Sequence, residues 1–129
     1  MKLMSVIPMA LLVMLPLASN AADKACLIEG KFSFMGQTIH SKDCVQSDPK
    51  ESEAAFKGSC EALANMSVQM GGEAGKIDYM EQCPLPAQGV CKGMMGTKRD
   101  AYYYARSESD LSTLPASCGQ LGGTWSSAD

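Results

Sequence analysis

Apolar and polar residues alternate in two neighbouring stretches, residues 31–35 and residues 38–41, which are separated by a glycine-containing turn at 36–37. Because side chains of a β-strand point alternately to its two faces, this pattern predicts a β-hairpin. Cys26 and Cys44 lie at the two ends of the predicted hairpin. We therefore expect these two cysteines to approach each other and to form a disulfide bond.

The pattern then changes to the period of a helix. Apolar side chains recur at spacings of three and four residues, which places them on one stripe of an α-helix. The stripe consists of Phe56, Cys60, Leu63, Met66 and Met70. We expect Asp48 to cap this helix together with Glu51. Pro49 suits its first position, and the glycines at 71–72 would end it. The stripe should be buried, with its methionines filling gaps in the core.

Shorter elements fill the rest of the chain. The tyrosine-rich and alternating segments favour strands, glycines favour turns, and a proline is tolerated in the first turn of a helix. The expected strands are 76–82, 89–95, 99–105 and 124–125, and the expected second helix is 113–121. This order predicts a small α+β domain that is stapled by disulfides, with a mostly antiparallel sheet, one long helix and one short helix.

The N-terminus has the features of a signal peptide. Lys2 precedes an apolar stretch at 6–18, and Ser19 and Ala21 are small residues at the positions that a signal peptidase requires. The apolar stretch is shorter than the ~20 residues of a membrane span. We therefore predict cleavage after Ala21 (residues 1–21 forming the leader), no membrane anchor afterwards, and a single soluble domain at 22–129 in the periplasm or outside the cell.

All cysteines follow the predicted leader, and their number is even. They are Cys26, Cys44, Cys60, Cys83, Cys91 and Cys118. In a short exported chain this indicates a framework of three disulfides with no free thiol. Six cysteines allow fifteen pairings. Apart from the bond across the hairpin, we expect the cysteines of the two helices to bond with those of the later strands.

The C-terminal part of the chain has a recognisable sequence pattern. Residues 89–91 read Gly-Val-Cys, residues 102–104 are three tyrosines, and Cys118 is followed by Gly-Gly-Thr-Trp at 122–125. This sequence pattern resembles a motif of small uncharacterised exported cysteine-rich proteins of bacteria. The resemblance implies an extracytoplasmic disulfide module, and it implies no particular activity.

Most kinds of catalytic and cofactor chemistry lack the necessary residues. His40 is the only histidine, and no nucleophile motif accompanies it, so we interpret it as a solvated residue of the hairpin. Cys83 and Cys91 are separated by seven residues, which is too many for a zinc knuckle. We expect no cofactor and no metal site. The net charge is −3 and there is no basic run, so we also expect no nucleic-acid partner.

The tyrosine run is the best candidate for a recognition surface, because tyrosine combines a large contact area with a polar tip. The candidate residues are Tyr102, Tyr103, Tyr104, Arg99 and Arg106. These features favour a non-enzymatic module that binds another protein, such as a periplasmic inhibitor or an immunity-type protein. Two alternatives remain open: a periplasmic copper-handling protein that uses methionines as soft ligands, with His40 as an extra one, and a small hydrolase built on His40.

Overall fold

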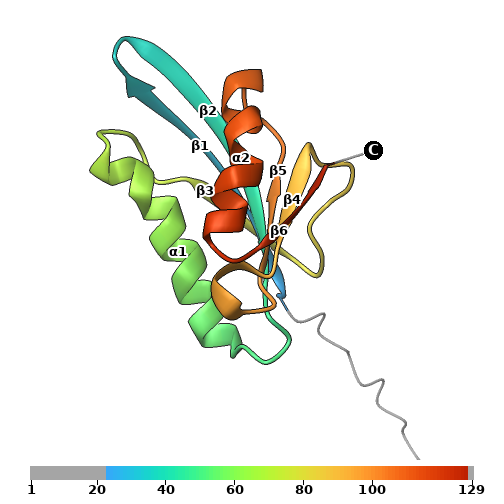
Figure 1. Cartoon of the computed structure of the whole chain (residues 1–129). Helices are drawn as coiled ribbons and strands as arrows, with labels where there is room; N and C mark the ends of the chain where they lie inside the picture. The colour runs from blue at the N-terminus through green and yellow to red at the C-terminus, as the bar shows by residue number, and fades with distance from the viewer. Residues whose placement is uncertain (1–22, 128–129) are drawn as a thin grey trace, which may run out of the picture.

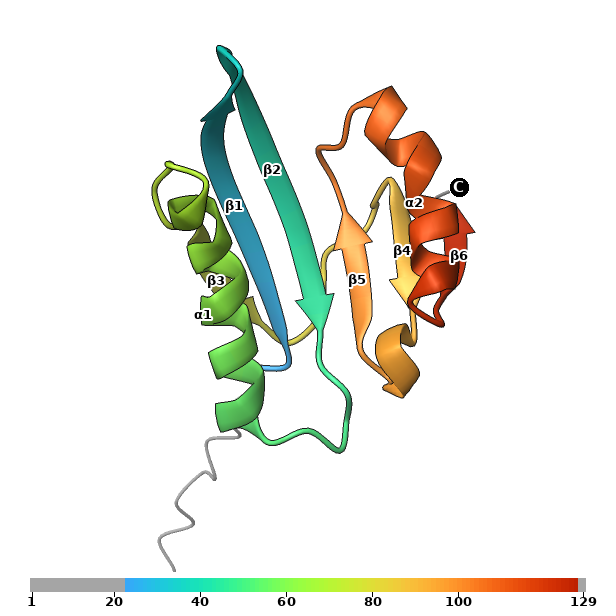
Figure 2. The same ribbon diagram turned by 60° about the vertical axis from the view of Figure 1, so that its left-hand side comes forward.

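Six antiparallel strands form one sheet, and both helices lie on the same face of it (Figures 1 and 2). The computed structural model describes residues 23–127, so the predicted leader lies outside the described residues. The strands lie in the order β3-β1-β2-β5-β4-β6. The elements are β1 (Ala25–Phe34), β2 (Gln37–Gln46), α1 (Glu53–Gln69), β3 (Lys76–Met80), β4 (Gly89–Lys92), η1 (Met94–Gly96, one 3₁₀ turn), β5 (Asp100–Tyr103), α2 (Glu108–Gln120) and β6 (Thr124–Ser127). The predicted small α+β domain is confirmed.

The predicted hairpin is present, and its turn lies one residue earlier than expected. Met35 and Gly36 occupy the turn, with φ angles of 52° and 78°. Two successive left-handed residues form the kind of tight turn whose twist matches that of the flanking strands. Phe34 therefore pairs with Gln37, and β1 and β2 continue as paired strands of ten residues each.

The expected bond between Cys26 and Cys44 is wrong. In the hairpin Cys26 pairs with Val45, whereas Cys44 pairs with Leu27. Paired residues share a face and successive residues alternate, so the two cysteines point to opposite faces of the sheet. In a hairpin with a two-residue turn, an even-numbered residue always pairs with an odd-numbered one. Cys26 and Cys44 both have even numbers, so no shift of such a turn would pair them.

All six cysteines form disulfides in another arrangement. The bonds are Cys26–Cys60, Cys44–Cys83 and Cys91–Cys118. The first fixes α1 on β1, the second fixes the segment after β3 on the opposite face, and the third fixes α2 on β4. The expectation that both helices bond with the later strands is therefore correct for α2 and wrong for α1. Each bond stabilises the fold by about 2–4 kcal/mol in a typical protein.

The first helix begins later than predicted. Ser52 is its N-cap, and its Oγ accepts a hydrogen bond from the backbone N–H of Ala55 at 3.2 Å. Asp48 instead accepts hydrogen bonds from the backbone N–H groups of Lys50 and Lys98, each at 2.9 Å. Asp48 therefore ties the approach to α1 to the segment before β5. The helix ends where predicted, with Gly71 in the left-handed conformation at φ 85°.

Only the first half of the predicted apolar stripe of α1 is buried. The buried residues are Phe56, Cys60 and Ala64, which lie at spacings of four. Leu63, Met66 and Met70 are 41%, 52% and 50% exposed, so the expectation that they lie in the core is wrong. The helix rests on β1 through the side that carries Phe56, and the remaining part of the stripe is left about half exposed.

The second helix begins five residues earlier than predicted. Ser107 is its N-cap and accepts from the backbone N–H of Asp110 at 3.2 Å, and two acidic residues lie in the first turn. Acidic side chains stabilise the positive end of a helix. Pro115 consequently lies inside the helix, and its expected place in the first turn is wrong.

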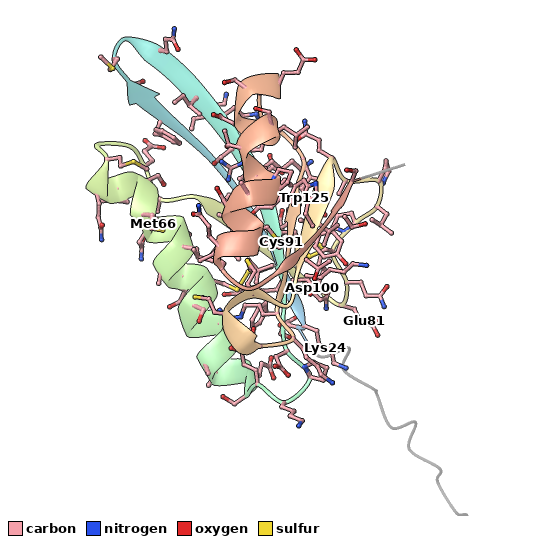
Figure 3. All side chains as sticks on the ribbon, in the orientation of Figure 1. Lys24, Met66, Glu81, Cys91, Asp100 and Trp125 are labelled. Atoms are coloured by element: carbon pink, nitrogen blue, oxygen red, sulfur yellow. A yellow bond between two sulfur atoms is a disulfide. The ribbon has the colours of Figure 1, made fainter. Side chains whose placement is uncertain are left out.

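Part of the C-terminal sequence pattern, namely Cys91, Tyr103, Cys118 and Trp125, packs together on the face of the sheet that α2 covers (Figure 3, where Cys91 and Trp125 are labelled). Trp125 pairs with Cys91, and its ring lies 5.8 Å from that of Tyr103. A Cβ at Gly89 would overlap the Trp125 ring, and a Cβ at Gly123 would lie 2.6 Å from the sulfur of Cys91. Both glycines are required because larger neighbours fill the space of a side chain.

This packing predicts the effect of Gly89→Ala. The added methyl group would collide with the Trp125 ring, and overpacking of this kind lowers the free energy of unfolding by about 1–3 kcal/mol. Gly58→Ala is the control: it lies inside α1 with nothing within 4 Å of the added methyl group, so it should raise the free energy of unfolding by about 0.5–1 kcal/mol. Urea unfolding measures both values. An unchanged free energy for Gly89→Ala would contradict the packing.

Candidate functional site

A large groove is lined by residues of both helices and of the strands β2 and β5, which lie between the two helices in the view of Figure 2. We call it the central groove. Its volume is about 1290 Å³, which exceeds the roughly 300–1,000 Å³ of typical small-molecule sites. The residues that line the central groove include Ile39, Ser41, Asp43, Leu63, Met66, Met70, Met94, Met95, Arg99, Tyr103, Arg106 and Asp110. Its size fits a segment of a polypeptide better than a metabolite.

One wall of the central groove is apolar. It is formed by Leu63, Met66 and Met70, which lie on one face of α1 at spacings of three and four and are about half exposed. Ile39 of β2, at 37% exposure, lies on the same side of the sheet. Flexible, polarisable methionine side chains are common on surfaces that bind apolar segments. The wall therefore has the composition of a binding surface.

The floor of the central groove contains an ion pair between β2 and the start of α2. Arg106 Nη2 donates to Asp43 Oδ2 at 2.6 Å, and the guanidinium lies 5.1 Å from the centre of the Tyr103 ring. The backbone of Arg106 is held as well, since its N–H donates to Gln88 Oε1 at 2.8 Å and its carbonyl accepts from Gln88 Nε2 at 3.0 Å. Arg106 is thus fixed at both its main chain and its side chain.

The pair is only partly satisfied. Among the described residues, the buried atoms Asp43 Oδ1 and Arg106 Nε have no hydrogen-bond partner. Burial raises the pKa of Asp43 above its usual value of 3.8, and this effect exceeds the opposing effects of the hydrogen bond and the charge of Arg106. Burial also raises the pKa of Tyr103, helped by the Asp43 charge. The floor of the central groove is therefore a poorly hydrated environment that disfavours the charged forms of Asp43 and Tyr103.

A second ion pair closes the lower end of the central groove. Arg99 Nη2 donates to Glu51 Oε2, and Ser59 Oγ lies 3.4 Å from the same nitrogen. The Arg99 guanidinium lies 6.0 Å from the centre of the Phe56 ring. Because Glu51, Phe56 and Ser59 all contact its guanidinium, Arg99 positions the start of α1 and has little freedom to meet a partner.

The five predicted recognition residues do not form one surface. Tyr103, Arg106 and Arg99 line the central groove. Tyr102 pairs with Cys44 and so points to the other face of the sheet. Tyr104 lies on that face too: its hydroxyl donates to the Pro84 carbonyl at 2.7 Å, and burial raises its pKa to about 12.

Sequence reasoning missed the apolar wall. Leu63, Met66 and Met70 were expected in the core, and a helical stripe does not show which part of it a sheet covers. The one available signal is Ala64, a small residue that continues the Phe56 and Cys60 spacing of four and thereby marks the buried row.

His40 lies on the face opposite to the central groove side of β2. Its Nε2 lies 3.8 Å from Glu29 Oε2, and its side chain is half exposed, as expected for a solvated strand residue. Its neighbours Ser41 and Asp43 point to the groove side, because successive side chains alternate. The nearest serine and aspartate of its own strand therefore face away from it.

The methionines line the central groove in two separate pairs. Met66 (labelled in Figure 3) and Met70 belong to the second half of α1, whereas Met94 and Met95 belong to η1, which lies level with the first half of α1 (Figure 1). Within residues 23–127, no cluster of three or more histidine, cysteine, aspartate or glutamate side chains is placed to hold a metal ion. In the same range no helix is long and apolar enough to cross a membrane.

No family model, curated protein or solved structure matches the chain.

The raised pKa of Asp43 predicts a dependence of stability on pH. A carboxyl group whose pKa is higher in the folded than in the unfolded protein contributes less to stability as the pH rises from 3.8 through the raised value. Asp43→Asn removes this dependence. The free energy of unfolding of the variant, relative to that of the wild type, should therefore increase across this pH range in a series of urea titrations. A constant difference would contradict the assignment.

Proposed function

We propose that this protein is an exported binding module, of the inhibitor or immunity type, that holds a segment of a partner protein in the central groove. The observation that carries the proposal is the apolar wall of α1, where Leu63, Met66 and Met70 remain exposed beside a groove larger than most small-molecule sites. Exposed apolar side chains gathered beside a groove mark interaction sites more often than scattered ones do.

The construction of the domain supports binding rather than catalysis. Both arginines that line the central groove are already paired with carboxylates, Arg106 with Asp43 and Arg99 with Glu51. Paired charges on fixed elements orient a ligand, whereas a general acid or base needs access to the reacting atoms. The three disulfides keep the walls in place, so that little conformational entropy is lost on binding. The resemblance of the C-terminal sequence pattern to a motif of exported proteins supports export.

The test compares two substitutions on the same helix. Met66→Glu places a charge on the apolar wall and should weaken capture of the partner from a periplasmic extract at least about tenfold, as expected for a central contact residue. Val68→Glu is the control, because Val68 is equally exposed at 50% and does not line the groove. Quantitative mass spectrometry of the captured proteins gives the readout.

The opposite face of the sheet is the competing surface. If the partner is lost with Tyr102→Ala combined with Tyr104→Ala and is retained with Met66→Glu, the contact lies on that face and the central groove is not the site. If neither change affects capture, the protein-binding proposal loses its structural basis.

A further inference from the structure

One edge of β2 is unpaired over half of its length. β5 pairs with β2 only from Asp43 to Gln46, and the last bond between them runs from the Tyr104 N–H to the Lys42 carbonyl at 3.1 Å. Beyond this point β2 continues to Gln37, whereas the chain of β5 turns away toward α2 (Figure 2). The result is an open notch in the middle of the sheet, which we call the β2 edge.

The alternation of backbone groups shows which of them are free. Because the Lys42 carbonyl faces β5, the N–H and C=O groups of His40 and Thr38 face the same side, while those of Ile39 and Ser41 face β1. Within the part of the chain that the structure describes, no strand pairs with the β2 edge at Thr38 or His40. The β2 edge thus offers alternating backbone donors and acceptors.

The matching part of β1 is covered, which makes the open edge specific to β2. A Cβ at Gly72 would lie 3.2 Å from the Lys31 carbonyl and 3.1 Å from the Cβ of Phe32. The segment after α1 therefore packs directly against the upper part of β1. Among residues 23–127, no strand other than β1 pairs with β2 at Thr38 and His40, which line the central groove although their side chains point to the other face.

The β2 edge and the apolar wall face the same space. Ile39 points to the helix side of the sheet, on which Leu63 and Met66 are exposed. A strand added beside β2 would place every second side chain on this side. Its other side chains would lie beside those of His40 and Lys42 on the opposite face, where polar or acidic residues fit the Lys42 charge.

We propose that the β2 edge takes up an extended segment of the partner protein as an additional strand, with alternating apolar side chains directed into the central groove. This inference rests on the proposed function and names its mode of recognition. Addition of a strand to an exposed sheet edge derives affinity from main-chain hydrogen bonds and specificity from alternate side chains. The N–H groups of Thr38 and His40 are the expected donors, because Tyr104 already lies opposite Lys42.

The test uses a synthetic peptide of about seven residues, a typical strand length, in which valine alternates with threonine and glutamate. Titration into ¹⁵N-labelled oxidised protein should shift the amide signals of Thr38 and His40 and slow their hydrogen exchange. The same peptide with alternate amides N-methylated should fail to bind. Equal binding of both peptides, or no binding of either, would overturn the proposal.

His40→Pro tests the edge from the protein side. Proline removes the outward N–H, which no strand of the described chain uses, and prolines are tolerated on edges of this kind. We expect binding of the peptide to weaken at least about tenfold, the effect of roughly one lost hydrogen bond. His40→Ala is the matched control: it keeps the N–H and removes only the side chain on the other face, so its binding should weaken by no more than about fivefold, the value of one cross-strand side-chain pair.

The two proposals fail in distinguishable ways. If Met66→Glu abolishes peptide binding and folded His40→Pro does not, the central groove is the site and strand addition is wrong. If a peptide that forms an amphipathic helix binds and the extended peptide does not, strand addition is also wrong. Should His40→Pro lose its far-ultraviolet circular dichroism, Thr38→Pro and the N-methylated peptide on the wild type still decide the question.

Discussion

The positions of two disulfides determine that the domain has a groove at all. Cys26–Cys60 holds α1 over β1, and Cys91–Cys118 holds α2 over β4, with β2 and β5 between those strands. Three strand spacings amount to about 14 Å. Helices in direct contact pack roughly 8–10 Å apart. Two helices tied over strands this far apart leave the middle of the sheet uncovered, and the exposed side chains of α1 follow from that separation.

The disulfides also divide the described part of the domain into two halves that no disulfide connects. Cys26–Cys60 and Cys44–Cys83 lie within the first half, and Cys91–Cys118 lies within the second. The halves meet along the short ladder between β2 and β5. Polar contacts support this ladder at both of its ends. One end has the Asp43–Arg106 ion pair, and the other has the Glu51–Arg99 ion pair together with the Asp48–Lys98 hydrogen bond. Each half is therefore held by its own disulfides, while the joint beneath the central groove is held by hydrogen bonds and ion pairs.

The sequence contains the information for the elements more clearly than for their contacts. Alternation identified the hairpin and the helical period identified α1, since both patterns are local. The pairing of Cys26 with Cys44 was wrong because proximity along the hairpin was considered without the alternation of faces, which excludes that bond for any two-residue turn. The exposure of Met66 and Met70 depends on the distance between α1 and α2, and no local pattern records that distance. Three of the five predicted recognition residues line the groove because the tyrosine run alternates across a sheet whose groove face could not be known in advance.

The ion pair on the floor and the β2 edge have one cause. The chain leaves β5 at Tyr104, and Arg106 fixes this departure through its bonds to Asp43 and Gln88, so that the ladder stops while β2 continues. Exposed strand edges invite aggregation, and natural proteins usually cover them or interrupt them with proline or a bulge. Within residues 23–127 the equivalent part of β1 is covered, whereas β2 has no proline and no second pairing strand at Thr38 and His40, directly beside apolar side chains that the fold does not bury. Stability alone gives no reason for that difference between two adjacent strands, whereas recognition of an extended segment does.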